Sequence, residues 1–175
     1  MDRAELIYYY QQLGDRNFER VDLRGQDLSH LKLVDIDLKG ALIKGANFEG
    51  SDLSRANLRS LTFQDVNLIG ACLNSADLSW AIVTNCTAEN SQFNDAVFNR
   101  AIIRDSTFEG SCFARGSFHS AKVPSTNFQK CDFSQSFFYN LQLNHVNLDQ
   151  ANLEKTYFVN IEMSLIEGSP LYDTT

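Results

Sequence analysis

Residues whose side chains could do chemistry are few in this sequence of 175 residues, and they are not spaced as a site. The histidines and cysteines are His30, His119, His145, Cys72, Cys86, Cys112 and Cys131. A metal site would show CxxC or HxxxH spacing, and neither occurs. Nucleophile elbows and phosphate-binding glycine loops are missing as well. The sequence therefore predicts no catalytic residue, no metal and no cofactor, in a protein that is not an enzyme.

One pattern governs the elements that must position these side chains. Every fifth residue is apolar at the 29 positions from Leu23 to Met163. Neither an α-helix nor a simple strand has a period of five. A short, unbroken repeat is typical of a solenoid, in which each unit buries its apolar side by stacking on its neighbours.

The residues around each apolar position follow a rule of their own. The residue two before it is mostly small, and the residue directly before it is often Asp or Asn. The pattern A(D/N)LXX appears in the blocks ANFEG, SDLSR, ANLRS and ADLSW, which begin at Ala46, Ser51, Ala56 and Ala76. It resembles the pentapeptide-repeat family over roughly 80% of the chain, and most closely the small cyanobacterial members with a short N-terminal helix. The resemblance implies an all-β fold, a right-handed quadrilateral parallel β-helix with 20 residues per coil.

A coil of 20 residues sorts the apolar positions into four columns and predicts about seven coils, stacked at about 4.8 Å. The core is expected to be aliphatic near the N-terminus and rich in stacked phenylalanines near the C-terminus. Cys86 and Cys131 fall on inward positions, while Cys72 and Cys112 lie two coils apart, too far for a disulfide. The three histidines fall on three different sides and are not expected to meet.

A single domain is predicted. It spans 1-175, with a helical cap at 2-13, the pentapeptide-repeat β-helix at 16-165 and a C-terminal tail at 166-175. We expect Asp2 to be the helix N-cap. The side chains expected to cover the first coil are Leu6, Tyr9, Tyr10 and Leu13. The tail either folds over the last coil or pairs with a second chain, so the protein is expected to be a monomer or a homodimer through its C-terminal end.

Composition limits the partners and the location. The net charge is −7, which argues against binding to nucleic acid or to an anionic membrane. No apolar run approaches the roughly 18 residues that span a bilayer. The N-terminal sequence lacks the basic and apolar regions of a secretory signal. A cytoplasmic protein is therefore expected, with neither nucleic acid nor a membrane as its partner.

Two surface features are candidates for recognition of a protein partner. The candidate acidic face consists of Asp27, Glu49, Glu89, Glu109 and Asp149, with Lys130 as the only positive charge on that side. It is either a solvated face or a surface for a basic partner. The candidate partner surface consists of Phe137, Tyr139, Tyr157 and Val159, with His119 one coil before. Apolar groups in outward positions on adjacent coils mark an interface, unless the tail covers them.

Another side of the rod carries further apolar residues. Trp80 is expected at a corner with Arg100 one coil above, which predicts a cation–π contact. An outward row of Leu42, Ile82 and Ile102 is broken by Thr62. We interpret this row as the β-propensity of a flat face rather than as a site.

Three functions are compatible with these features. The first is a non-enzymatic scaffold for protein–protein interaction or regulation, because the resemblance implies a regulatory partner for some relatives, including in control of heterocyst differentiation. The second is an acidic DNA mimic that binds a type II topoisomerase, as the resemblance to quinolone-resistance relatives implies. The sequence departs from those relatives in having no projecting loops, a short tail and sparse charge. A purely structural role without a partner is the third.

Overall fold

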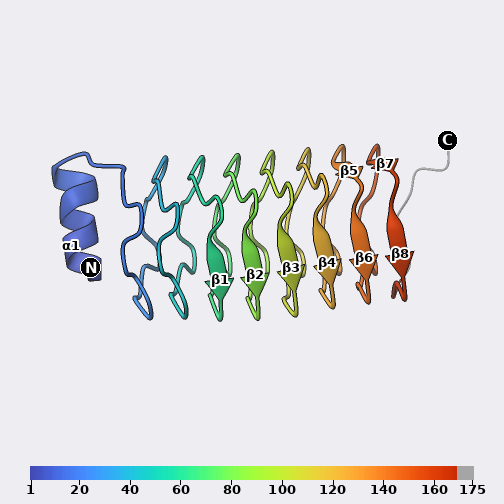
Figure 1. Ribbon diagram of the computed structural model, residues 1–175, viewed down its shortest axis with the longest axis horizontal. Coiled ribbons are helices and arrows are strands. Elements are labelled where there is room, and N and C mark those ends of the chain that lie inside the picture. The colour runs from blue at the N-terminus through green and yellow to red at the C-terminus, as the bar shows by residue number, and fades with distance from the viewer. Residues whose placement is uncertain (169–175) are drawn as a thin grey trace.

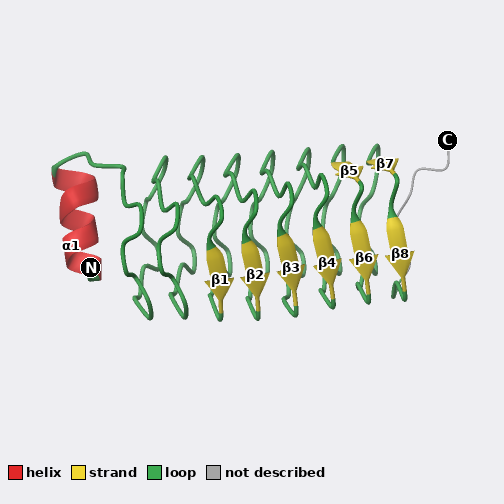
Figure 2. Ribbon diagram, viewed as in Figure 1, coloured by secondary structure: helices red, strands yellow, loops and turns green. Residues whose placement is uncertain are grey.

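The computed structural model describes residues 1–168 and shows a rod of stacked coils with a helix across its N-terminal end (Figure 1). Six short strands follow one another along one side of the rod. They are β1 (Thr62–Gln64), β2 (Ile82–Thr84), β3 (Ile102–Arg104), β4 (Lys122–Pro124), β6 (Gln142–Asn144) and β8 (Glu162–Ser164). Two further strands, β5 (Phe137–Tyr139) and β7 (Tyr157–Val159), pair on another side (Figure 2). All of these pairs are parallel, so the fold is the parallel β-solenoid that the repeat predicts.

The pairing register confirms a coil of 20 residues. Thr62 pairs with Ile82, and the same spacing recurs in isolated bridges from Asn17↔Asp37 to Asn147↔Glu167. The six-stranded sheet by itself spans five coil steps. The bridges Asp22↔Leu42 and Leu42↔Thr62 add two more steps on the same side. This side therefore has seven coil steps, and the sequence predicted about seven coils.

Each side of the coil ends in a corner with an unusual backbone conformation. At every fifth position from 20 to 165 the φ angle lies between 51° and 70°. Among these corners of the described chain, the glycines are Gly25, Gly40, Gly45, Gly50, Gly70 and Gly110. The left-handed conformation costs a residue with a side chain about 1–2 kcal/mol. Packing and hydrogen bonding between coils must therefore hold most corners in place, because the local sequence does not favour them.

The core is filled by the two inward residues of each block. In its C-terminal half, phenylalanine rings repeat at coil spacing. Phe93, Phe113 and Phe133 stack with ring centroids 4.9 Å apart, and Phe98 stacks on Phe118 at the same distance. The prediction of stacked rings is thus confirmed in these two columns, whereas Phe118 and Phe138 meet edge to face at 5.3 Å.

The N-terminal end is covered by α1 (Arg3–Ile7) and the π-helical turn η1 (Tyr8–Gln12). Asp2 caps α1 as expected, since its side chain accepts from the backbone N–H of Glu5 at 2.9 Å. The residues that close the end are Leu6 and Tyr10, which are 0% and 7% exposed. The Tyr10 hydroxyl also donates to the backbone oxygen of Val34 at 2.7 Å.

The covering face of this helix differs in part from the prediction. Tyr9 and Leu13 are 41% and 60% exposed, so assigning them to the covering face was wrong. The assignment assumed an α-helical period throughout. In η1, the N–H of Leu13 bonds to the oxygen of Tyr8, five residues back, and this wider turn rotates Leu13 away from the face of Leu6.

The C-terminal end of the described rod has no comparable cover. Phe158 and Met163 occupy inward positions of the repeat, yet they are 39% and 53% exposed. They lose burial because the coil that would stack on them is missing within residues 1–168. The expected tail at 166–175 begins inside the described part with Ile166, Glu167 and Gly168, and its residues 169–175 lie outside the described residues.

Candidate interaction surfaces

The five residues of the candidate partner surface lie together near the C-terminal end of the rod. The paired strands β5 and β7 position four of them, with Phe137 opposite Tyr157 and Tyr139 opposite Val159. Strand geometry explains the exposure, because Phe138 between them points inward and its neighbours must point outward. Phe137, Tyr139, Tyr157 and Val159 are all between 43% and 59% exposed. We call these four residues and His119 the aromatic surface.

Ring contacts give the aromatic surface a defined shape. Phe137 and Tyr157 stack with centroids 5.0 Å apart and an interplanar angle of 4°. His119 packs on Tyr139 at 4.7 Å, and its backbone N–H donates to the Asn99 side chain at 3.0 Å. Because neighbouring rings hold one another, these large side chains have little freedom left to lose on binding.

The aromatic surface continues onto the open C-terminal end. Phe158 belongs to β7, Met163 belongs to β8, and Leu165 at the next corner is 69% exposed. The sequence predicted the first two as core residues, so their part in this apolar region was missed. The end of the repeat at residue 165 was a signal for this, because no further coil of the repeat follows to cover Phe158 and Met163.

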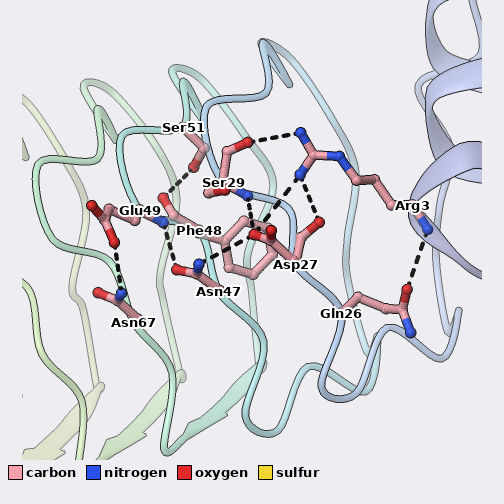
Figure 3. A network of polar contacts seen from close by, with 9 residues as sticks. All are labelled: Arg3, Gln26, Asp27, Ser29, Asn47, Phe48, Glu49, Ser51 and Asn67. Atoms are coloured by element: carbon pink, nitrogen blue, oxygen red, sulfur yellow. Dashed lines mark hydrogen bonds and ion pairs between the residues drawn. The ribbon is translucent and has the colours of Figure 1, made fainter.

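The candidate acidic face lies on the opposite side of the rod, half a coil away from the aromatic surface. It is tied to the N-terminal helix (Figure 3). Arg3 reaches down from α1 and donates to the backbone oxygens of Asp27 at 2.6 Å and Ser29 at 3.0 Å. Its guanidinium also lies 3.8 Å from the Asp27 carboxylate. Hydrogen bonds from the side chain and backbone of Ser29 lower the pKa of Asp27, against a smaller opposing effect of desolvation.

Much of the charge on this face is paired or partly covered. Lys130 lies 2.7 Å from Glu109, and this hydrogen bond raises the pKa of Lys130. Glu89 and Asp149 are half-buried, and Asp149 accepts from the side chain of Gln129 at 3.2 Å. The Oε2 atom of Glu89 is buried without a hydrogen-bond partner in the described part of the chain. Glu49 remains exposed and accepts from Asn67 at 3.3 Å.

The Asp and Asn residues before each inward position stabilise the turns. Asn47 accepts from the backbone N–H of Glu49 at 3.1 Å, and Asp77 accepts from that of Ser79 at 2.9 Å. The same contact two residues ahead recurs at many corners. It is the Asx-turn bond that favours these residue types in turns, and it accounts for their abundance without any role in acid–base chemistry.

The histidines and cysteines do not assemble into a site. No group of three potential metal ligands occurs among residues 1–168. His30 and His145 stand at corners, away from His119 in the aromatic surface. Cys86 and Cys131 are buried, and burial raises the pKa of both thiols, to about 11 for Cys86. Both thiols are therefore kept protonated and unreactive at neutral pH.

The remaining cysteines lie on one ladder. Gln92 pairs with Cys72 on one side and with Cys112 on the other, which places the two cysteines two coils apart as predicted. They are free and half-buried.

A rod of coils with four five-residue sides, a filled core and decorated faces defines the class of parallel β-solenoids. The family model described as "Pentapeptide repeats" matches the chain in eight copies, over residues 41–79, 76–115 and 125–158. The chain belongs to the pentapeptide-repeat family. Members of this family are generally non-catalytic structural scaffolds.

Several solved structures are similar to this chain. A pentapeptide repeat protein from the Arabidopsis thaliana thylakoid lumen is 27% identical with a TM-score of 0.51, and the match covers 58% of this chain and 68% of that one. HetL, described as involved in heterocyst differentiation regulation in the cyanobacterium Nostoc, is 16% identical with a TM-score of 0.49 over 95% and 94% of the two chains. QnrB1, a plasmid-mediated fluoroquinolone resistance protein, is 17% identical with a TM-score of 0.46 over 86% of each chain. No curated protein matches the sequence.

The described helices are short. Within residues 1–168, none has the length and apolar character needed to cross a membrane.

Proposed function

We propose that this protein is a non-enzymatic scaffold that binds another protein through the aromatic surface. The observation that carries the proposal is the contrast between the two ends of the rod. The N-terminal end is closed by Leu6 and Tyr10, whereas Phe137, Tyr139 and Tyr157 stand half-exposed in one cluster at the other end. Exposed aromatic groups in a cluster are typical of protein interfaces.

The rest of the molecule supports a scaffold. Its core is filled, and its potential acids, bases and nucleophiles are dispersed over different sides or buried. A rod held by hydrogen bonds at every coil presents its faces with little change of shape, so a partner would meet a surface already in its binding conformation.

A matched pair of double variants tests this proposal. Tyr139→Ala/Tyr157→Ala removes two exposed rings from the aromatic surface. Tyr8→Ala/Tyr9→Ala removes two rings that are 54% and 41% exposed at the opposite end. Each tagged variant is cross-linked in the native host and its captured proteins are quantified by mass spectrometry. We expect the amount of each specific partner captured by the first variant to fall at least about tenfold, as it does when hot-spot residues are truncated. The second variant should capture the same amount as the wild type. Equal recovery by the two variants would contradict the proposal.

Self-association is a specific form of the same proposal. The chain mass is 19.8 kDa, so light scattering distinguishes a monomer from a homodimer formed through the C-terminal end. A dimer through this end would dissociate in the Tyr139→Ala/Tyr157→Ala variant and persist in the Tyr8→Ala/Tyr9→Ala variant. The cytoplasmic location expected from the sequence is also part of the proposal, and fractionation of the host cell tests it.

The alternative of an acidic DNA mimic gains no specific support from the structure. Such a mimic needs unpaired negative charge at phosphate-like density, about one per 1.7 Å of duplex. On the acidic face, Asp27 and Glu109 are paired with Arg3 and Lys130. A supercoiling assay with added protein checks this conclusion, and strong inhibition of a type II topoisomerase would reverse it.

A further inference from the structure

A groove with a basic end lies on the side of the rod formed by β2, β3 and β4. Its lining residues are Trp80, Ile82, Arg100, Ile102, Ser120 and Lys122, and its volume is about 440 Å³. The sequence suggested the Trp80–Arg100 contact and the Ile82–Ile102 row as separate features, the row as mere β-propensity. The structure joins them, because Trp80 and Ile82 lie on either side of one corner and line one space.

The floor of the groove is apolar. Ile82 and Ile102 are paired neighbours in the parallel sheet, and they are 38% and 36% exposed. Trp80 stands at the corner beside them and is 50% exposed. Three large apolar side chains on adjacent coils thus form one continuous patch.

The C-terminal end of the groove is cationic. Arg100 lies over the Trp80 ring with its guanidinium carbon 4.6 Å from the ring centroid. Lys122 continues the Ile82–Ile102 row on the next coil. The six lining residues include two cations and no carboxylate, although the whole chain has a net charge of −7. Neither cation has an ion pair within residues 1–168, so both remain available to an anionic group.

We propose that this groove binds an extended segment of a partner protein that carries a large apolar residue and an acidic residue on the same face. The apolar side chain would lie on Ile82 and Trp80, and the carboxylate would meet Arg100 and Lys122. Lys122 is two coil steps from Ile82, about 9.6 Å at strand spacing. Side chains two positions apart on an extended chain are about 6.8 Å apart, and the reach of the lysine side chain covers the difference.

The openness of the groove favours a protein segment over a small molecule. Small-molecule sites bury most of the surface of their ligand, whereas this groove lies along an open face with half-exposed walls. Tryptophan and arginine are the residue types most enriched in protein-binding hot spots. The groove runs along the corner that Trp80 and Arg100 share with the side of the aromatic surface. Its six lining residues include none of that surface, so separate variants test the two proposals.

Trp80 makes this proposal directly measurable, because it is the only tryptophan in the chain. The probe is an acetylated and amidated octapeptide of serines with one leucine two positions before one glutamate. We expect its addition to the full chain to change Trp80 emission saturably, with half-saturation below about 1 mM. The control peptide has lysine in place of glutamate, and octanoate serves as a small amphiphilic carboxylate.

Two charge reversals locate the binding. Lys122→Glu alters the groove, and Lys39→Glu makes the same change at an exposed lysine outside it. We expect Lys122→Glu to lower the affinity for the glutamate peptide by at least about tenfold, because a charge pair is lost. Lys39→Glu should leave this affinity unchanged. Both variants alter exposed side chains, and thermal melts verify that they fold.

Several results would overturn the proposal. They are no saturable change with the glutamate peptide, equal binding of the lysine peptide, equal loss in both variants, or saturation by octanoate without the peptide. A concentration-dependent change in emission without any peptide would instead identify a second copy of the chain as the occupant, which also overturns it.

Discussion

Phe113 is the residue whose removal tests the packing of this rod most severely. Its side chain is fully buried, and its ring contacts six others. The partners are Phe93, Phe98, Phe108, Phe118, Phe128 and Phe133, with centroids 4.9 to 5.9 Å away. Because those rings brace one another, the core cannot collapse into the space that Phe113→Ala leaves. We therefore expect a cost near the upper end of the usual range, about 5 kcal/mol.

Phe158→Ala is the matched control. The same substitution is made at the same repeat position, but Phe158 is 39% exposed and meets one ring, Phe138, at 5.3 Å. Its truncation should cost only about 1–2 kcal/mol, since much of the side chain is already in water. For a chain of this length, 1 kcal/mol shifts the melting temperature by about 2–4 °C.

Thermal unfolding followed by circular dichroism measures both variants. We expect Phe113→Ala to lower the melting temperature by about 10–20 °C and Phe158→Ala to lower it by a few degrees. Equal shifts in the two variants would refute the placement of Phe113 at the centre of a ring cluster.

Two further predictions concern stability. Ala101 is fully buried at the small inward position, so Ala101→Leu should overpack its coil and cost about 1–3 kcal/mol. A thermal melt equal to that of the wild type would contradict this. Asp95 accepts two hydrogen bonds from Arg115, at 2.7 and 2.8 Å, which hold the pKa of Asp95 below its ordinary value of 3.8. The pair therefore contributes stability above that value and loses it as the pH falls further. The melting temperature of Asp95→Asn should vary less than that of the wild type below pH 4, and parallel pH profiles would contradict the assignment.

The sequence predicted the coil well because the same apolar spacing recurs at 29 successive positions, each of which indicates the same register. A register carried by Leu23, Met163 and the apolar residues between them cannot shift without exposing a whole column. The same redundancy placed Cys72 and Cys112 two coils apart and brought the aromatic surface together, since stacking needs only the 20-residue period.

Features outside the repeat were predicted less well. The π-helical turn at Tyr8–Gln12 was not predicted, because nothing in the local sequence distinguishes it from an α-helix. Corners such as Trp80 and Leu165 adopt left-handed backbone conformations that their side chains disfavour. The groove was missed because Trp80 and Ile82 belong to different sides of the coil, and only the folded corner shows that they line one space.

The central claim is that residues 20 apart lie side by side along the rod, and engineered cysteine cross-linking tests it most directly. Gln92→Cys places a thiol between Cys72 and Cys112, to both of which position 92 is paired. Strand spacing falls within the separation that a disulfide accepts. On mild oxidation of this variant, peptide mapping should find a bond from position 92 to Cys72 or Cys112. Ile102→Cys, on another side of the coil, should form no such bond. A variant at position 92 that stays reduced while the one at position 102 links to Cys72 or Cys112 would contradict the 20-residue coil.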